Sequence, residues 1–491
     1  MRGNAMLKLK NKALLQTKCL INGEWVESSE GSTLDVFNPA NGELVATVAT
    51  VGAAQTEQAI AAAEAAQKTW KKKTAKERAA LLRRWHDLLM ENQEDLAKLM
   101  TAEQGKPLAE SRGEIGYTAS FIEWFAEEGK RIYGDMIPTY APDRRILVMK
   151  EPVGVCAAIT PWNFPAAMIT RKAGPALAAG CTMIIKPASE TPLSALAMGV
   201  LAIEAGIPAG VINIVVGKAS TIAKTLTDSS VVRKLTFTGS TPIGKLLMKD
   251  CADTMKKVSL ELGGNAPFVV FDDADIDEAV KGAMMSKYRN AGQTCVCANR
   301  IYVQAGVYDS FVEKFAAQVA AMKVGHGTES GVEQGPLINR AAVDKVDEHV
   351  QDAISKGGKI VTGGKHHELG DNFYQPTVIA NATQDMLFAK EETFGPLAPV
   401  FRFETEDDVI AMANDTEYGL ASYFYSRDIG RIFRVAEALE TGLVGVNAGV
   451  IATEVAPFGG YKESGLGREG SKYGIEDYIN TKYVCVAGLD K

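Results

Sequence analysis

The sequence predicts an α/β protein built on a doubly wound, largely parallel sheet. Apolar strand-like runs alternate with helix-like segments through the middle of the chain, and polar or glycine-rich residues follow the ends of these runs. The length of 491 residues exceeds what one hydrophobic core usually organises, so more than one domain is expected. In sheets of this class ligands gather at the carboxyl ends of the strands.

The strand-like runs cover residues 155–160, 182–186, 211–216, 234–238 and 257–262. Thr191 followed by Pro192 predicts a helix start, with Thr191 as its capping residue, and another helix should open near Ser240. A second alternation follows, with strands at 266–271, 300–303 and 399–403 and helices around 307–322, 341–356 and 429–439. Residues 145–150 and 481–486 read as strands, the latter after a helix-like segment at 474–480.

Two local signals come before the central sheet. Asn22-Gly23 predicts a tight turn between short strands, and Thr74 with Glu77 predicts a capping box at a helix start.

Charge and cysteine content narrow the class of protein. A net charge of -7 argues against nucleic acid or an anionic membrane as the main partner. The longest uncharged stretch, residues 152–170, contains three prolines and is a poor membrane helix. Seven cysteines and no signal-like start predict a reducing, cytoplasmic setting. The five histidines show no zinc-ligand spacing, so no metal is expected. Met6 is a second candidate start, which leaves the origin of residues 1–5 open.

Three side chains could carry nucleophilic chemistry. Cys295, in Gly292–Cys297, is a candidate nucleophile, and Glu261, which ends an apolar strand, is a candidate base. Asn163 lies between two prolines, where a rigid amide could stabilise an oxyanion. Taken singly, each has an ordinary alternative: a buried thiol, a charge at a solvated sheet edge and a turn asparagine.

Two further segments could hold a dinucleotide. Gly239 and Ser240 join a strand to a helix start, which forms an anion site, although the G-x-G-x-x-G fingerprint is absent. Lys186 ends the second strand and Ser189 follows it, where a cofactor ribose would lie.

Together these segments resemble the aldehyde dehydrogenase superfamily over nearly the whole chain. The motifs that carry the resemblance are residues 161–165, 260–264, 292–295, 391–396 and 457–460. Within the superfamily, residues 166–172, 289–297 and 465–470 most resemble the succinate-semialdehyde dehydrogenases of bacterial 4-aminobutyrate degradation.

The resemblance implies a three-part architecture. Residues 12–140 and 152–264 would form a Rossmann-type dinucleotide-binding domain, and residues 265–463 an α/β catalytic domain. Residues 141–151 and 478–491 would be the strands of a small β element for oligomerisation, giving a homodimer or homotetramer.

The resemblance also implies a chemistry that needs no metal. Cys295 would attack the aldehyde, the Asn163 amide and the Cys295 N–H would hold the oxyanion, and Glu261 would activate water to release the acid. The positions implied for cofactor binding are Trp162, Lys186, Ser189, Gly217, Gly239, Ser240, Glu392 and Phe394.

Ser189 stands where NAD-preferring relatives often carry glutamate, so NADP is expected as cofactor, with NAD possible but weaker. The alternative is that Ser189 only caps the following helix and both cofactors work.

The implied substrate carries a carboxylate. Arg171 and Arg289 would bind it, and Phe458 would form an apolar wall. In relatives, the loop before Pro457 adds a hydroxyl group to the substrate site. Here the loop reads Ile451-Ala452-Thr453, and the sequence does not show which residue would supply that hydroxyl. Succinate semialdehyde is the expected substrate; glutarate semialdehyde or another short aldehyde is the alternative, because one methylene is worth only ~1–3 kcal/mol.

Two other questions stay open. Some relatives with a Cys-x-Cys loop form a reversible disulfide, so Cys297 is either a redox switch for Cys295 or an inert thiol. The rival classes are a cysteine hydrolase and a non-catalytic protein on the same fold.

Overall fold

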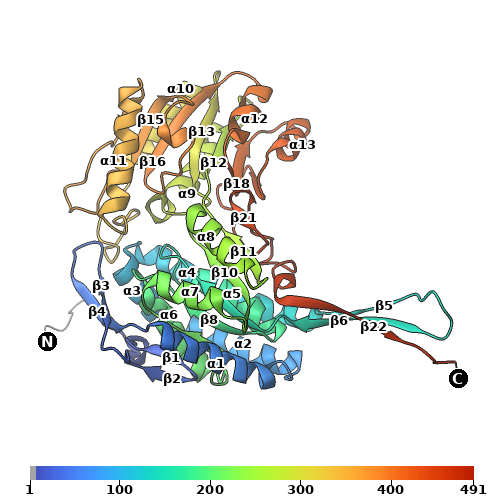
Figure 1. Cartoon of the computed structure of the whole chain (residues 1–491). Helices are drawn as coiled ribbons and strands as arrows, with labels where there is room; N and C mark the ends of the chain where they lie inside the picture. The colour runs from blue at the N-terminus through green and yellow to red at the C-terminus, as the bar shows by residue number, and fades with distance from the viewer. Residues whose placement is uncertain (1–6, 491) are drawn as a thin grey trace.

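The computed structural model describes residues 7–490, so the question about residues 1–5 lies outside the described residues (Figure 1). Two α/β halves lie one above the other, and a narrow arm of strands projects from the lower half. The α/β fold predicted from the alternation of runs is confirmed.

The lower half is organised by an eight-stranded sheet. Its strands, in spatial order, are β2 (Glu24–Val26), β1 (Cys19–Ile21), β9 (Ile212–Ile214), β8 (Thr182–Lys186), β7 (Val155–Ile159), β10 (Val232–Thr238), β11 (Lys257–Glu261) and β21 (Gly465–Leu466). The five strands from β9 to β11 are mutually parallel. The helices of this half are α1 (Ala53–Trp70), α2 (Ala75–Glu91), α3 (Gln93–Gln104), α4 (Leu108–Glu128), α5 (Ala167–Ala179), α6 (Pro192–Glu204), α7 (Ala219–Asp228) and α8 (Thr241–Ala252).

The upper half contains a seven-stranded sheet. Its strands, in spatial order, are β14 (Lys359–Thr362), β15 (Thr377–Ala382), β16 (Leu397–Phe403), β13 (Ala298–Gln304), β12 (Ala266–Val270), β18 (Ala421–Tyr425) and β19 (Leu443–Val446). All neighbours are parallel except β14 and β15. Its helices are α9 (Ile276–Tyr288), α10 (Tyr308–Ala320), α11 (Arg340–Ser355), α12 (Glu406–Asn414) and α13 (Ile429–Ala438).

The remaining elements are short. The arm consists of β5 (Asp135–Ile137), β6 (Arg145–Pro152) and β22 (Ile479–Val486), and small pairs form from β3 (Thr33–Phe37) with β4 (Leu44–Ala49) and β17 (Tyr418–Gly419) with β20 (Tyr461–Lys462). Single 3-10 turns are η1 (Lys12–Leu14), η2 (Gly129–Arg131), η3 (Arg289–Gly292), η4 (Leu387–Ala389) and η5 (Glu476–Tyr478).

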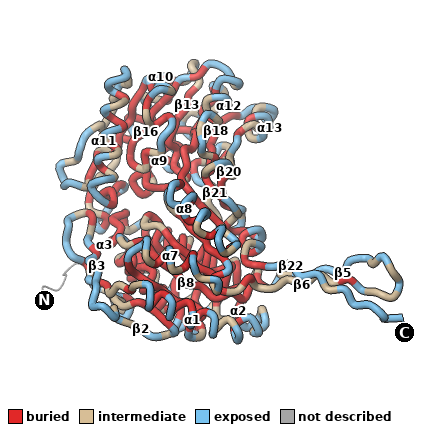
Figure 2. The backbone as a smooth tube through the Cα atoms, viewed as in Figure 1, coloured by how far each residue is buried: buried red, intermediate tan, exposed pale blue. Residues whose placement is uncertain are grey.

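Burial follows the two sheets. One large apolar cluster fills the lower half, and two clusters pack against the upper sheet. Figure 2 shows buried backbone concentrated in both halves and a mostly exposed arm. No helix within residues 7–490 combines the length and apolarity needed to cross a membrane.

The local signals at the start of the chain are present. Asn22 and Gly23 both have positive φ in the turn between β1 and β2. The Thr74 hydroxyl accepts from the Glu77 N–H, and the Glu77 carboxylate accepts from the Thr74 N–H, so the capping box at α2 is confirmed.

Two local predictions are wrong. Helix α6 begins at Pro192 as predicted, with Thr191 at the N-cap position, but the Thr191 side chain makes no capping bond. The Glu103 carboxylate from α3 accepts from the N–H groups of Leu193 and Ser194 instead. The helix predicted at residues 474–480 is only the single turn η5, because strand β22 begins at Ile479 to pair with β6.

The order of the parallel strands determines where a ligand can bind. In chain order, β7, β8 and β9 are placed one after another toward one edge of the sheet, whereas β10 and β11 are placed toward the other edge. The switch therefore lies between β7 and β10, and a crevice is expected beyond the carboxyl ends of these two strands. The segments that follow them contain Asn163 and Ser240.

The residue ranges assigned to the domains stay predictions, and β21 lies outside those ranges although it pairs with β11.

Candidate active site

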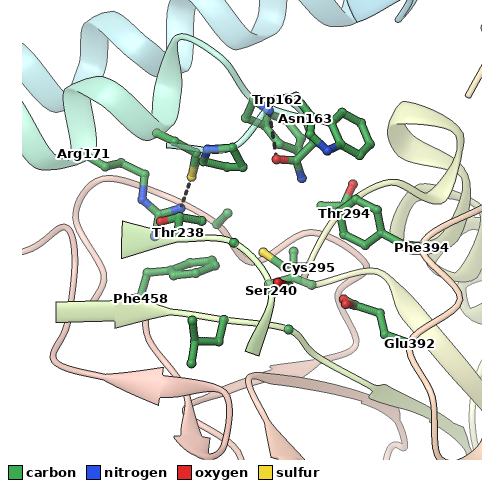
Figure 3. A pocket seen from close by; sticks show the side chains of 18 of the residues that line it. Trp162, Asn163, Arg171, Thr238, Ser240, Thr294, Cys295, Glu392, Phe394 and Phe458 are labelled. Carbon is green, nitrogen blue, oxygen red and sulfur yellow. Dashed lines mark hydrogen bonds between the residues drawn. The ribbon is translucent and has the colours of Figure 1, made fainter. Parts of the chain in front are cut away.

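A cavity of about 260 Å³ lies at this switch point. Ten of the residues predicted from the sequence line it: Trp162, Asn163, Arg171, Gly239, Ser240, Arg289, Cys295, Glu392, Phe394 and Phe458. Other predicted residues do not line it, namely Glu261, Lys186, Ser189, Gly217 and Cys297. Figure 3 shows the Cys295 side chain in the middle, with Arg171 and Phe458 on one side and Phe394 and Glu392 on the other. The cavity thus has a cationic end and an acidic, aromatic end, with a thiol between them.

An unusual backbone turn presents the thiol. Asn290 and Ala291 have φ values of 50° and 55°, and Gly292 follows at 76°, so three consecutive residues are left-handed. A Cβ on Gly292 would lie 2.2 Å from the Gly395 carbonyl oxygen, which leaves room only for glycine. Left-handed alanine is strained and persists only where the surroundings hold it, a pattern common at functional sites. Cys295 lies three residues after Gly292.

Burial governs the chemistry of Cys295. It raises the pKa of the Cys295 thiol to about 12, although the nearby Arg171 guanidinium opposes the shift. The thiol is therefore protonated at neutral pH, and nucleophilic attack requires an acceptor for its proton. The Cys297 thiol is buried and donates a hydrogen bond to the Lys287 carbonyl at 3.6 Å. Neither Cys297 nor Cys295 forms a disulfide in this structure. The redox role of Cys297 stays a prediction.

The Asn163 side chain is held by two hydrogen bonds. Its Oδ1 accepts from the Phe164 N–H at 3.1 Å, and its Nδ2 donates to the Gln293 carbonyl at 2.9 Å. An amide carries two N–H hydrogens, so one remains for the cavity that Asn163 and Cys295 both line. This arrangement can place a fixed donor beside an oxyanion.

Glu261 ends β11 in a buried position, and its Oε2 has no hydrogen-bond partner in the described structure. Burial raises the pKa of Glu261 well above its usual value, and the Glu469 charge adds to the shift, while Arg171 and Lys172 oppose it. A carboxylate with a raised pKa is a stronger base when ionised.

The cationic end contains two guanidinium groups. Arg171 is buried; its Nε lies 2.8 Å from Glu469 Oε2, and its guanidinium centre lies 3.9 Å from the centre of the Phe458 ring. Its second terminal nitrogen, Nη2, has no hydrogen-bond partner in the described structure. Arg289 is half-buried and lies over the Phe164 ring at 4.9 Å. Glu469 neutralises part of this charge, but unpaired guanidinium donors remain to receive an anion.

Ten residues that line the cavity are not among the predicted site residues: Tyr117, Pro161, Phe164, Met168, Thr238, Leu262, Gly263, Thr294, Val296 and Ala452. Tyr117 of α4 lines the cavity, and its buried hydroxyl has no hydrogen-bond partner in the described structure. Nothing in the surrounding sequence signals this role, because Tyr117 lies in a helix far from every motif. In the loop before Pro457, Ala452 lines the cavity, whereas the Thr453 hydroxyl donates to Glu454.

The opposite end suits a dinucleotide. Burial raises the pKa of Glu392 to about 8, and its carboxylate accepts from the Gly264 N–H. Phe394 has a φ of 54° and meets Trp162 edge to face, with ring centres 5.7 Å apart. Helix α8 begins after Ser240 without a side-chain cap, which leaves its first N–H groups available to a phosphate.

The adenosine side depends on Lys186 and Ser189. Lys186 is 4% exposed, and burial lowers the pKa of its amine while the Glu190 charge opposes the shift. The amine makes no hydrogen bond or ion pair within the described residues. An amine without a partner at the end of a strand can receive an anionic or hydroxylated ligand. Ser189 is half-buried and does not cap α6, so the capping alternative for this residue is wrong. No group of three or more His, Cys, Asp or Glu residues in the range 7–490 is arranged to hold a metal ion.

The fold and the cavity define a class of protein: a doubly wound α/β protein with a half-buried cysteine between an anion-binding end and a nucleotide-binding end. Residues 25–484 match the model of the aldehyde dehydrogenase family. The chain is 63% identical over 480 residues to succinate-semialdehyde dehydrogenase [NADP(+)] of Escherichia coli, covering 98% of this chain and 100% of that protein. It is also 63% identical over 483 residues to glutarate-semialdehyde dehydrogenase of Pseudomonas aeruginosa, with the same coverage.

Solved structures agree with this match. The crystal structure of an E. coli NADP-dependent enzyme superposes with a TM-score of 0.97 at 62% identity, covering 98% of this chain and 100% of that chain. The chain belongs to the aldehyde dehydrogenase family, and the family resemblance inferred from its motifs is confirmed.

Proposed function

We propose that this protein oxidises succinate semialdehyde to succinate with reduction of NADP, as a step of 4-aminobutyrate degradation. The observation that carries the proposal is that Arg171 and Arg289 line the same cavity as Cys295. A carboxylate held by both guanidinium groups places the other end of a short chain near the thiol. The name of the E. coli relative, a succinate-semialdehyde dehydrogenase for NADP, supports the same assignment.

The chain's own residues supply the steps at the aldehyde. Cys295 Sγ attacks the aldehyde carbon and forms a C–S bond, while the free N–H of the Asn163 amide and the Cys295 backbone N–H donate to the developing oxyanion. We assign Glu261 as the acceptor of the thiol proton; because it does not line the cavity, its side chain must turn toward Cys295. NADP held by Glu392 and Phe394 at its nicotinamide end would supply the hydride acceptor, so that the adduct on Cys295 could become a thioester. Glu261 first passes the thiol proton to solvent and then takes a proton from water as the water attacks the thioester. The C–S bond breaks, the departing Cys295 thiolate takes up the proton from Glu261, and the acid and free thiol are released.

The cofactor preference rests on the Lys186 and Ser189 pair. The Lys186 amine can hold the adenosine ribose, and Ser189 brings no carboxylate to repel a 2′-phosphate. Glu392 and Phe394, at the other end, would hold the nicotinamide ribose and ring, and Trp162, Gly217, Gly239 and Ser240 would lie along the dinucleotide path.

Glutarate semialdehyde is the second candidate substrate. The P. aeruginosa relative is as similar as the E. coli one, and its name gives the substrate one methylene longer. A panel of semialdehydes of different length, each run with NAD and NADP, tests both proposals. The highest kcat/KM should belong to succinate semialdehyde with NADP. A higher kcat/KM for glutarate semialdehyde would make that compound the preferred substrate. A higher kcat/KM for aldehydes without a carboxylate would reject the proposed role of Arg171 and Arg289 in binding the substrate carboxylate.

We also propose that the protein forms a homodimer or homotetramer through the arm. Met136, Tyr140 and Tyr483 are 71%, 72% and 60% exposed on it, and large apolar side chains left this open usually meet a partner. Light scattering on the purified protein tests this directly, and a monomeric mass would reject it.

A further inference from the structure

A buried amine supports the loop that carries Asn163. Lys106 lies between α3 and α4 and is 2% exposed. Its Nζ donates to the Asn163 backbone carbonyl at 2.7 Å and to Glu114 Oε2 at 2.6 Å, and it lies 4.1 Å from the centre of the Phe164 ring. Burying an ammonium group is costly unless it is paired and hydrogen-bonded, and here the partners are Glu114 and the Asn163 backbone.

Glu114 extends this support to the end of the same loop. Its second oxygen accepts from the N–H groups of Ala166 and Ala167 at 3.0 and 3.2 Å, at the start of α5. The Lys106–Glu114 pair therefore contacts the loop at Asn163 and again at the residues where it enters the helix.

Asn290 joins this loop to the one that carries the thiol. Its Nδ2 donates to the Asn163 carbonyl at 3.1 Å and lies 3.4 Å from the Gln293 carbonyl, which also accepts from the Asn163 side chain. Its Oδ1 accepts from Gln104 Nε2 at 3.0 Å, and Gln104 Oε1 accepts from the Lys106 N–H at 2.9 Å. These bonds form one connected network in which every side chain is buried.

We infer that Lys106 and Asn290 are positioning residues that hold the Asn163 amide in register with the Cys295 sulfur. Neither lines the cavity, so neither touches the substrate. Their effect on the reaction acts through Asn163, where a displacement of about 1 Å can cost on the order of 100-fold in rate. The inference rests on the oxyanion role proposed for Asn163.

A double-mutant cycle separates positioning from general stability. Asn163→Ala should lower kcat by roughly 100- to 1000-fold, the usual effect of losing one oxyanion donor. Lys106→Met and Asn290→Gly should each lower kcat by about 10- to 100-fold; glycine suits the positive φ at position 290. When either substitution is combined with Asn163→Ala, kcat should fall less than about two-fold below that of Asn163→Ala alone, because the amide that Lys106 and Asn290 position is gone.

Two further readouts test the mechanism. Alkylation of Cys295 by iodoacetamide forms no oxyanion, so its rate, followed as loss of residual activity, should change less than about three-fold in the single variants. The NADP dissociation constant should change as little. The matched control is Lys234→Met: this lysine is also buried, but its amine donates to Ser259, away from Asn163. It should lower thermal stability and leave kcat within about two-fold.

Three results would overturn the inference. They are reductions of kcat that multiply in the double variants, alkylation of Cys295 that slows in parallel with kcat, and a reduction of kcat in Lys234→Met as large as that in Lys106→Met. If Lys106→Met does not fold, Glu114→Gln is taken through the same cycle under the same criteria. A normal kcat for Asn163→Ala would instead reject the proposed oxyanion role, which is a different failure.

Discussion

Replacing Arg289 with methionine tests the anion-binding end of the cavity with little damage to the fold. Arg289 is half-buried and packs over the Phe164 ring, and methionine keeps most of that apolar contact. Arg171 is less suitable, because it is buried against Glu469 and breaking such a pair commonly costs 3–5 kcal/mol of stability.

The size of the effect follows from the position of the charge. A guanidinium about 4 Å from a carboxylate contributes between ~1 kcal/mol in water and ~4 kcal/mol at a protein surface. Arg289 is half-buried, so its interaction with the carboxylate should fall between these two energies, and it shares the anion with Arg171. We therefore expect Arg289→Met to lose about 2 kcal/mol of binding free energy for the carboxylate. This corresponds to a roughly 30-fold lower kcat/KM for succinate semialdehyde, carried mainly by KM.

The assay compares two aldehydes at constant ionic strength. Oxidation of succinate semialdehyde and of propanal is followed through the absorbance of reduced cofactor, and kcat/KM for propanal should change less than two-fold. Arg402→Met is the control, because Arg402 also lies over an aromatic ring, that of Tyr308, but outside the cavity. Equal losses for both aldehydes would refute the reasoning, since a neutral substrate has nothing for Arg289 to bind.

Three other substitutions test the remaining parts of the site. Glu261→Gln should lower kcat by roughly 100- to 10,000-fold. Because burial raises the pKa of Glu261 well above its usual value, the fraction of ionised base grows with pH beyond the range in which an ordinary glutamate titrates; wild-type kcat should rise there, and the variant should lose that rise. A wild-type kcat independent of pH would exclude this base. Ser189→Glu places a carboxylate near the expected 2′-phosphate at a cost of about 2 kcal/mol, so the ratio of kcat/KM for NADP over NAD should fall roughly 30-fold; an unchanged ratio would mean that the phosphate lies elsewhere. Tyr117→Phe removes the unpaired cavity hydroxyl, so KM for succinate semialdehyde should rise about 10-fold while KM for butanal stays constant, and a parallel rise for both would show a packing effect only.

The sequence by itself was enough to predict the fold class and the identity of the chemical groups. Strand-like runs and helix starts are local properties, so the parallel sheet, the capping box at Thr74 and the turn at Asn22 could all be read without coordinates. Gly292 is predicted only as part of the loop that carries the nucleophile; its left-handed backbone and the close Gly395 carbonyl are visible in the structure alone.

Only the tertiary structure decided which groups meet. The cap of α6 comes from Glu103, some ninety residues earlier, because a buried helix start accepts any carboxylate that packs against it, and sequence spacing cannot reveal such a partner. Tyr117 reaches the cavity through the packing of α4 against α5. The same holds for Lys106, whose contact with Asn163 joins residues 57 positions apart. Local sequence could name Cys295, Asn163 and Arg171, but the burial that raises the pKa of the thiol and the separation of the two cavity ends are properties of the folded chain alone.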